Sequence, residues 1–414
     1  MIRIKPFNGV RPAKEYASKI ASLPYDVMNS EEAREIAKND PHTFLHVVKP
    51  EIDLPENINI YDEKVYKKGR ENYEALKKDK RLVKDKEPSL YVYREKMGKV
   101  IQTGLVTCCH IDDYLEKNIK IHEHTRTVKE IDRMKHVDAI NANAGPVFLT
   151  YRKKDTIQKI IGDFIDNNSP EYNFTTDDKV EHTFWKISDL SIINNITEQF
   201  NEIEYLYVAD GHHRSAAAAK TGEKRRSNNA LHTGNEEYNW FLAILFPHDD
   251  LYIMDYNRAV KDLNGFTEEE FINKVSEIFE VKKVNNAYKP ETMHTFGMYI
   301  NKNWYSLKAS EELFDKNDVI ESLDVSILYN NLLSPLLEIG DPKTDNRIDF
   351  IGGIRGLKEL ERIVNNGTFE VAFSMFPTKI EQLMDVADKN KVMPPKSTWF
   401  EPKLRSGLVI HELE

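Results

Sequence analysis

Patterns typical of helices and of strands alternate along the whole chain, and this alternation limits the fold to a mixed α/β class. No repeat at the period of a solenoid or a propeller interrupts it. A loop at Asn264-Gly265 separates two stretches of the alternating pattern, and a new helix is expected directly after it. We therefore predict two domains, 1–264 and 265–414, with a soft boundary between them.

The clearest expected elements are helices and one β-hairpin. Two helices should cover 30–38 and 61–78, and the two strands of the hairpin should cover 90–94 and 100–107. Thr127 with Glu130 matches a capping box, and the segment Thr267–Glu270 should cap another helix, so a helix should begin at each place. After the first box, an apolar stripe should face the core, formed by Val128, Ile131, Met134 and Val137.

The composition is that of an ordinary globular protein in water. Of the 414 residues, 40% are hydrophobic and 30% charged, and no run approaches the roughly 18–20 apolar residues of a membrane span. The first residues lack the apolar core of a signal peptide, and the adjacent Cys108 and Cys109 cannot build a disulfide framework. A net charge of −10 disfavours non-specific nucleic-acid binding. We therefore expect a cytoplasmic protein without a membrane or nucleic-acid partner.

The most informative local feature is a strand that runs into a polar turn and then directly into a helix. The strand is expected over 204–209, and an alanine-rich helix over 215–220 that ends at Gly222. A helix N-terminus presents unpaired N–H groups and a positive dipole end, glycine allows close backbone approach, and arginine can bind a phosphate with two hydrogen bonds. The pattern therefore predicts a phosphate site, and the alternative is a junction that the histidines merely cap. The polar residues in question are Asp210, Gly211, His212, His213 and Arg214.

A second polar segment, His122-Glu123-His124-Thr125, precedes the helix expected at Thr127. A carboxylate flanked by imidazoles, outside any apolar stripe, can serve as a general base, which makes Glu123 a candidate. A solvated acidic loop and a His-x-His metal pair are the alternatives, although no cysteine or carboxylate cluster at metal-like spacing supplies further zinc ligands.

Three further segments carry polar residues that chemistry could use. Lys396-Ser397-Thr398 imitates the end of a P-loop but lacks its glycines, so contact with a phosphate or carboxylate and a purely structural loop are both open. Asp26 follows Pro24-Tyr25, where a turn is favoured over a ligand. The basic cluster 224–226 favours a solvated loop over a phosphate site.

These motifs, in this order, resemble those of one family. The chain is identified as a member of the domain-of-unknown-function ten-fifteen family over nearly its whole length. The Asp-Gly-His-His-Arg core, the upstream His-Glu pair and the downstream Pro-Lys-Ser-Thr segment are also similar to those of free serine kinases of the ParB/sulfiredoxin superfamily. The motifs that carry the resemblance are Pro24–Val27, His122–Thr125 with Asp132-Arg133, Asp210–Arg214 and Met393–Thr398.

The resemblance implies a ParB/sulfiredoxin-like catalytic core, with an N-terminal extension and a C-terminal α/β domain that closes the active site. It implies a kinase that phosphorylates the hydroxyl of free L-serine, with ATP or ADP as donor and Mg²⁺ as cofactor. Glu123 would accept the hydroxyl proton. The resemblance assigns substrate binding to Asp210, His212 and His124, and nucleotide phosphate binding to Gly211, His213, Arg214, Lys396, Ser397 and Thr398. It implies no metal ligand from the protein.

The chain departs from the minimal kinases in two respects, a longer N-terminal part and a long insertion between Glu123 and Asp210. The insertion could reshape the acceptor pocket, so a kinase of another small hydroxyl compound is an alternative. A ParB-like nucleotide-dependent DNA-binding switch is another. Against the switch stand the acidic balance of the chain and the lack of a recognisable helix-turn-helix with a basic recognition helix.

Overall fold

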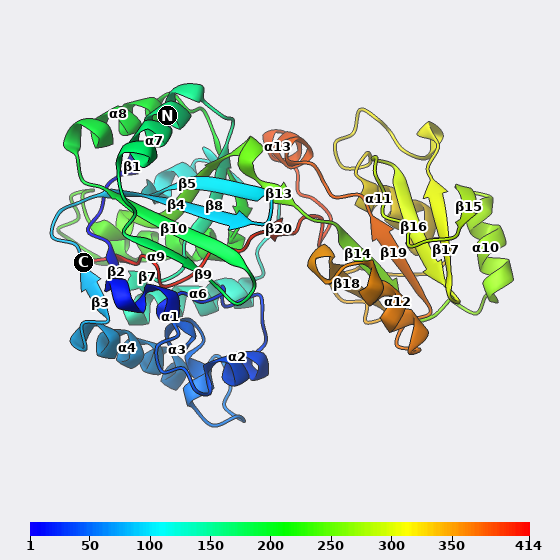
Figure 1. The fold of residues 1–414 in the computed structure, drawn as a ribbon, viewed down its shortest axis with the longest axis horizontal. Helices are drawn as coiled ribbons and strands as arrows, with labels where there is room; N and C mark the ends of the chain where they lie inside the picture. The colour runs from blue at the N-terminus through cyan, green and yellow to red at the C-terminus, as the bar shows by residue number, and fades with distance from the viewer. The chain divides into compact units, whose positions relative to one another are not determined.

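The structure, a computed structural model, describes all 414 residues. They form two compact units, the first made of Met1–Leu251 with Pro402–Glu414, and the second of Tyr252–Glu401. Each unit contains its own helices and sheet, so the expected mixed α/β class is confirmed (Figure 1).

This division differs from the expected domains, 1–264 and 265–414, at both ends of the second unit. The first unit ends at Leu251, and the last residues of the chain return to it. In that return, the backbone of Ile410 pairs with Val10, and the backbone of Ser406 pairs with Ser22. Pairing between segments so far apart in the sequence leaves no local pattern, so the sequence did not reveal it.

A nine-stranded mixed sheet organises the first unit. Its strands lie in the order β6 (Ile119–Lys120), β11 (Leu206–Asp210), β8 (Val147–Tyr151), β12 (Trp240–Pro247), β5 (Val100–His110), β4 (Leu90–Met97), β10 (Val180–Ile187) and β9 (Tyr172–Thr175), with β1 (Ile4–Lys5) paired to β5. Most neighbours are antiparallel, but β11 runs parallel to β6, and β12 runs parallel to β8. Because β6 and β11 run in the same direction, the segments that follow them leave the sheet at the same end.

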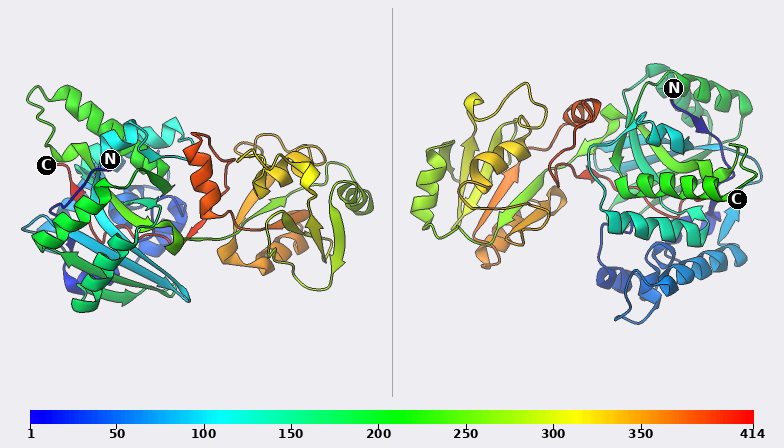
Figure 2. Two further views of the ribbon diagram at one scale, coloured as in Figure 1. Left: turned by 90° about the horizontal axis from the view of Figure 1, so that it is seen from above. Right: turned by 180° about the vertical axis from the view of Figure 1, so that it is seen from behind.

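Some of the helices of this unit pack against the sheet, and others pack on those helices. They are α1 (Ala17–Ile20), α2 (Ser30–Ala37), α3 (Leu45–Val48), α4 (Glu63–Lys78), α5 (Ile111–Leu115), α6 (Thr127–Ile140), α7 (Asp155–Asn167), α8 (Leu190–Asn201) and α9 (His212–Asn228). Apolar side chains of α7, α8 and α9 join those of the strands in one core cluster. Helix α9 packs on α6, and α6 packs on α4, an order that Figure 1 and the right view of Figure 2 display.

Two short strand pairs tie the ends of the chain to this layer. Strand β2 (Val10–Pro12) pairs with β3 (Leu82–Lys84), and β7 (Ala142–Asn143) pairs with β21 (His411–Glu412). The second pair fixes the C-terminal segment next to the end of α6. Ile140 and Ile410 accordingly share a core cluster with residues of α2, α3 and α4.

The locally encoded elements agree with expectation. Helices α2 and α4 confirm the two helices expected over 30–38 and 61–78. Strands β4 and β5 pair as an antiparallel hairpin in which Met97 lies opposite Val100, which confirms the expected hairpin. In each case a cap or a turn in the sequence marks the end of the element, since Asn29 and Asp62 cap the two helices through their side chains.

The second unit is built on a six-stranded antiparallel sheet. Its strands lie in the order β15 (Glu280–Val284), β17 (Asn303–Lys308), β16 (Thr295–Ile300), β19 (Val371–Met375), β14 (Tyr256–Val260) and β18 (Ile348–Gly352), and a separate pair joins β13 (Tyr252–Ile253) to β20 (Phe400–Glu401). Its helices are α10 (Glu268–Ser276), α11 (Asp324–Leu328), α12 (Leu357–Asn365) and α13 (Ile380–Asp388). No helix of either unit combines the length and the apolar character needed to cross a membrane.

Candidate functional site

The predicted strand–turn–helix junction is present in the first unit. Strand β11 ends at Asp210, Gly211 adopts φ 93° and ψ 32°, and α9 begins at His212. Glycine is required here because this left-handed conformation strains other residues, and because a Cβ atom on Gly211 would lie 3.0 Å from Nε of Arg214. The turn therefore places the Arg214 guanidinium directly against the start of the helix.

Helix α9 is longer than the helix expected over 215–220. It continues to Asn228 and passes through Gly222, which was expected to end it. Gly222 instead allows close packing, since a Cβ atom there would lie 2.6 Å from the carbonyl oxygen of Tyr238. The glycine was therefore wrongly interpreted as a stop, because its role depends on a neighbour that is distant in sequence.

The segment 122–126 lies beside this junction, because β6 runs parallel to β11 just before it. The rings of His122 and His212 meet edge to face, with centroids 4.5 Å apart. The backbone N–H of Arg126 donates to Nε2 of His213 at 3.1 Å. Glu123 and His124 follow His122 in this loop and have exposed side chains. The structure thus brings the two motifs together, as a shared site requires.

Asp210 is an anion held by two cations. Its Oδ1 accepts a hydrogen bond from Gly211 N at 2.8 Å, and its Oδ2 lies 3.6 Å from Lys403 Nζ and 3.8 Å from Arg214 Nη2. Burial alone would raise the pKa of Asp210, but Lys403 and Arg214 outweigh it and lower the pKa to about 2. Asp210 is therefore ionised at any physiological pH.

The histidines of the junction are neutral at physiological pH. Burial lowers the pKa of His122 to about 4. Burial, reinforced by His122, lowers the pKa of His212 well below its usual value, and burial also lowers that of His213. Since Nε2 of His213 accepts a hydrogen bond from Arg126 N, the proton of this neutral ring lies on Nδ1, which makes Nδ1 a donor.

Three buried polar atoms at the junction have no hydrogen-bond partner. They are Nδ1 of His122, Nε2 of His212 and Nε of Arg214. Buried polar groups in folded proteins are nearly always paired, so a cluster of unpaired ones indicates a place where a polar ligand binds. The available donors are a guanidinium, imidazoles and the N-terminus of the 17-residue helix α9, and this set suits a phosphate.

Helix α6 confirms the expected start at Thr127 but contradicts the expected cap and apolar stripe. Its N-cap is Arg126, which makes no side-chain capping bond. Glu130, assigned to the cap, instead accepts a hydrogen bond from Thr125 and forms an ion pair with Lys220 of α9. Val128 and Ile131 of the expected stripe are exposed.

The buried face of α6 is polar, which is the reason that the apolar stripe was wrong. Asp132 accepts a hydrogen bond from the Tyr66 hydroxyl at 3.0 Å and another from Arg133 Nε at 2.9 Å. His136 Nε2 bonds the carbonyl oxygen of Val47 at 2.8 Å. A helix can bury such groups only where partners satisfy them, and two of these partners, Tyr66 and Val47, come from elsewhere in the sequence.

The N-terminal turn approaches the same face of α6. Pro24–Val27 forms the expected turn, with Val27 N bonded to the carbonyl of Pro24. The guanidinium carbon of Arg133 lies 4.0 Å from the centre of the Tyr25 ring. Burial, followed by the nearby charge of Asp26, raises the pKa of Tyr25. The turn prediction is confirmed, and the turn also supplies an aromatic contact to Arg133 that was not predicted from the sequence.

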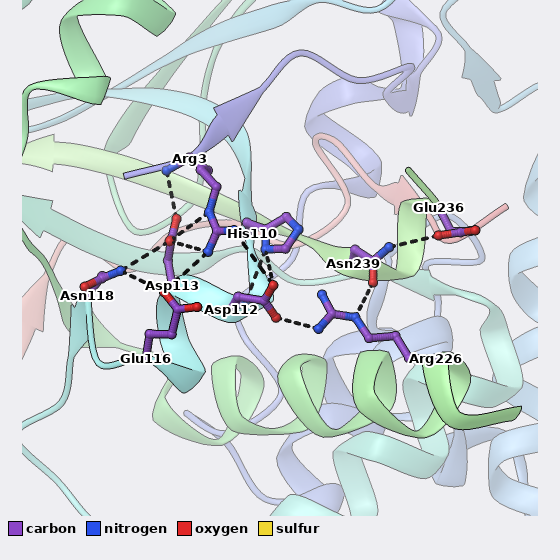
Figure 3. A network of polar contacts seen from close by, with 9 residues as sticks. All are labelled: Arg3, His110, Asp112, Asp113, Glu116, Asn118, Arg226, Glu236 and Asn239. Carbon is purple, nitrogen blue, oxygen red and sulfur yellow. Dashed lines mark hydrogen bonds and ion pairs between the residues drawn. The ribbon is translucent and has the colours of Figure 1, made fainter. Parts of the chain in front are cut away.

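The basic cluster 224–226 is neither a loop nor an open phosphate site. It forms the last turns of α9, where Lys224 and Arg225 pair with Asp138 of α6. Arg226 pairs with Asp112 and donates to Asn239, in the network of Figure 3 that also joins Asp113 to Arg3. The charges of this cluster attach α9 to α5 and α6.

The segment 393–398 belongs to the second unit, where it forms an ordered loop. Ser397 is buried, and its hydroxyl donates to the carbonyl of Pro394 at 2.7 Å. Lys396 adopts φ 59°, and its ammonium lies 5.5 Å from the centre of the Tyr256 ring. A structural role is therefore evident for Ser397, while a role for Lys396, Ser397 and Thr398 in phosphate binding stays a prediction.

Two basic residues of the site were not predicted from the sequence: Lys403, which pairs with Asp210, and Arg133, which pairs with Asp132. Arg133 belongs to the motif Asp132-Arg133, and this membership could have indicated a role at the site. No local pattern indicated a role for Lys403, because its role depends on the return of the C-terminal segment to the first unit. No group of three or more His, Cys, Asp or Glu side chains is arranged to hold a metal ion.

Residues 4–326 match the family described as "Protein of unknown function (DUF1015)", so the chain belongs to this family and the resemblance is confirmed. No curated protein matches the sequence.

Among solved structures, the chain is similar to a free serine kinase in complex with AMP, at 15% identity and a TM-score of 0.35, over 71% of this chain and 86% of that one. It is similar to a conserved hypothetical protein from Pyrococcus furiosus, at 14% identity and a TM-score of 0.34, over 73% of this chain and 93% of that one. It is also similar to SbnI with a C-terminal truncation from Staphylococcus aureus, at 10% identity and a TM-score of 0.36, over 72% of this chain and 82% of that one. Values this low do not carry an activity from those proteins to this chain.

Proposed function

We propose that this chain is a nucleotide-dependent small-molecule kinase that phosphorylates the hydroxyl of free L-serine, giving O-phospho-L-serine. The observation that carries the proposal is the meeting of the His122–Thr125 loop with the junction Asp210–Arg214, where three buried polar atoms lack partners. The choice of serine rests on the resemblance of these motifs to those of free serine kinases.

The junction would hold the phosphates of the donor, ATP or ADP. The N–H groups at the start of α9, the Nδ1–H of His213 and the guanidinium of Arg214 are donors in one place. Gly211 keeps the backbone open to close approach. Positive charge and fixed donors at this position would stabilise the charge that develops on the transferred group.

Glu123 would act as the base. It would accept the proton of the serine hydroxyl while the hydroxyl oxygen forms a bond to the terminal phosphorus of the donor. The bond from that phosphorus to the bridging oxygen breaks, and the nucleotide leaves with one phosphate fewer. Asp210, ionised because of its low pKa, suits the ammonium group of an amino acid. His212 and His124 would complete the acceptor contacts.

Mg²⁺ would neutralise charge on the phosphates. The side chains of the junction fit an ion whose ligands come mainly from the nucleotide. Asp210 is assigned to the ammonium group of the acceptor, and no group of three or more His, Cys, Asp or Glu side chains is arranged to hold the ion. Mg²⁺ commonly keeps several waters and binds through phosphate oxygens with few protein carboxylates. Lys396, Ser397 and Thr398 would contribute further phosphate contacts, a role that rests on the resemblance alone.

The test is phosphoryl transfer from a donor labelled in its terminal phosphate. Purified protein with Mg²⁺ and either ATP or ADP is incubated with L-serine and with a panel of other amino acids and small alcohols. Labelled O-phospho-L-serine is expected, and Glu123→Gln should reduce it strongly. Transfer to another alcohol but not to serine would retain the kinase and discard the substrate. No transfer to any acceptor from either donor would contradict the proposal.

A further inference from the structure

A small pocket lies next to Arg214 within the first unit. Its walls come from α6, α9, strands β8 and β12, the N-terminal turn and the C-terminal segment. Its internal volume is about 40 Å³, on a scale where one water molecule needs roughly 10–15 Å³. The pocket therefore admits a group of a few heavy atoms, which is much smaller than a nucleotide.

The lining of this pocket contains two guanidinium groups and no carboxylate. The groups belong to Arg133 and Arg214, whose side chains are 12% and 10% exposed. His136, which also lines the pocket, bonds Val47 O, and burial lowers its pKa to about 3, so it is neutral. The charged atoms that a guest would meet are therefore positive ones.

Neither guanidinium is fully used by the protein. Arg133 binds Asp132 through Nε at 2.9 Å and Nη2 at 2.7 Å, and its Nη1 donates to the carbonyl of Val48 only weakly, at 3.4 Å. The remaining N–H groups of its two Nη atoms have no hydrogen bond to the protein among these contacts. Arg214 donates from Nη1 to the carbonyl of Pro146, its ion pair with Asp210 is long at 3.8 Å, and its buried Nε has no partner. The unpaired Nε lies beside Gly211 at the junction, whereas Nη1 lies beside Gly145 on the pocket side. Since each Nη atom carries two N–H groups, both guanidinium groups keep donors for an anion in the pocket.

Arg214 lies between two glycines, which open its side chain toward two places. On one side is Gly211, at the start of α9. On the other is Gly145, where a Cβ atom would lie 3.7 Å from Arg214 Cδ and 3.4 Å from Ser406 Oγ. The same side chain can therefore reach a phosphate at the helix start and a second anion in the pocket.

We infer that this pocket binds the carboxylate of the phosphoryl acceptor, which restricts the substrates to small hydroxy acids and hydroxy amino acids. This inference rests on the proposed function. Arg133 and Arg214 hold the carboxylate, Ser406 adds a hydroxyl, and the apolar walls formed by Val147, Ala218 and Phe241 exclude larger groups. With the carboxylate fixed there and the ammonium near Asp210, the hydroxyl of a short acceptor stays close to the junction.

The test compares the binding of three probes to the full chain by isothermal titration calorimetry, without nucleotide. L-serine and 3-hydroxypropanoate carry the carboxylate, whereas ethanolamine carries only the amine and the hydroxyl. Both carboxylates should bind, and ethanolamine should bind roughly 10- to 100-fold more weakly than L-serine, the factor expected for lost charge-assisted hydrogen bonds. Equal binding of ethanolamine and L-serine would overturn the inference.

A matched pair of glycine variants tests the location. Gly145→Ala adds a methyl group at ordinary contact distances inside the pocket, so the fold should persist while the affinity for L-serine falls about 10-fold or more. Gly162→Ala adds the same methyl group on α7, where a Cβ atom has no neighbour within 4 Å, and should bind L-serine as the unchanged protein does. Unchanged affinity of Gly145→Ala for L-serine would place the carboxylate elsewhere.

Binding and transfer separate the two claims. If the carboxylates bind as expected but no phosphoryl group is transferred, the pocket stands and the kinase proposal fails. If transfer occurs equally well to ethanolamine and to L-serine, the kinase stands and the carboxylate pocket fails.

Discussion

The N-terminal ends of α6 and α10 carry the same sequence signature but form different structures. At α10, Thr267 accepts a hydrogen bond from Glu270 N, and the Glu270 carboxylate accepts one from Thr267 N, so the box closes. At α6, Thr127 makes no cap, and Glu130 turns instead to Thr125 and Lys220. The two ends differ in what lies beside them.

The difference shows that contacts with distant segments can override a local capping signal. Helix α10 buries Phe271 and Val275, an ordinary apolar face. Helix α6 buries Glu130, Asp132 and His136, and packs on α9, which begins at the junction. Because a buried polar face must be satisfied by other segments, the failure of the apolar stripe at α6 is itself a sign of the site.

The largest effect expected at the α6 end comes from Glu123→Gln. The amide keeps the shape of the side chain but cannot accept a proton, so the rate of phosphoryl transfer should fall by about 10²–10⁴. Steady-state kinetics with L-serine measures this, and nucleotide affinity should change by no more than a few-fold. Glu270→Gln, the matched change at the α10 end, should leave the rate as it was. Near-normal turnover of Glu123→Gln would place the base elsewhere.

Acid should destabilise the junction. The pKa of His122 is about 4 in the folded protein, below the roughly 6.5 of an unfolded histidine. The unfolded chain therefore takes up this proton first as the pH falls. The contribution is fully present above about pH 6.5 and is lost between about pH 6.5 and pH 4, by about 3 kcal/mol.

Denaturant unfolding of the protein and of His122→Asn at several pH values measures this contribution. The variant lacks the imidazole, so its stability should fall less over this range. Identical pH dependence of the two proteins would show that His122 is already protonated, or solvated, in the folded state.

Arg214→Ala should weaken nucleotide binding by roughly 1.5–3 kcal/mol, the range for a lost charge-assisted hydrogen bond. Arg225→Ala, on the same helix but paired with Asp138 away from the junction, provides the control and should bind as the unchanged protein does. Calorimetric titration with ADP measures both. An equal loss in the two variants would indicate a general electrostatic effect and not a contact at Arg214.

The smallest effect concerns the two caps. Thr267→Ala should cost about 0.5–2 kcal/mol of local stability, because a capping hydrogen bond is lost. Thr127→Ala should cost less than about 0.5 kcal/mol, since no such bond exists there. The rate of amide hydrogen exchange in the first turn of each helix measures the change in local stability. If exchange accelerates equally in Thr267→Ala and in Thr127→Ala, the two helix ends do not differ in capping.

Elements with local signals were predictable from the sequence. Helices α2 and α4, the β4–β5 hairpin and the α10 cap each depend on residues close together in the chain. The junction at Gly211 was also predictable, because strand, glycine and helix are consecutive. Local chemistry alone specifies these features.

What the sequence did not reveal depends on long-range pairing. Lys403 reaches Asp210 only because the C-terminal segment returns to the first unit. Glu130 was predicted to cap α6, but it pairs with Lys220 of α9 instead. Gly222 was predicted to end α9, but it lies inside the helix and allows close packing against the Tyr238 backbone. In each case the deciding atom belongs to another element.

The most direct measurement follows the unpaired Nε–H of Arg214 during nucleotide binding. In protein labelled with ¹⁵N-arginine, the Nε resonance of Arg214 is identified by its loss in Arg214→Lys. Addition of ADP with Mg²⁺, in the absence of any acceptor, should shift this resonance, and adenosine should not, because the phosphates supply the partner that this buried group lacks. A resonance that stays in place at saturating ADP would contradict phosphate binding at the junction.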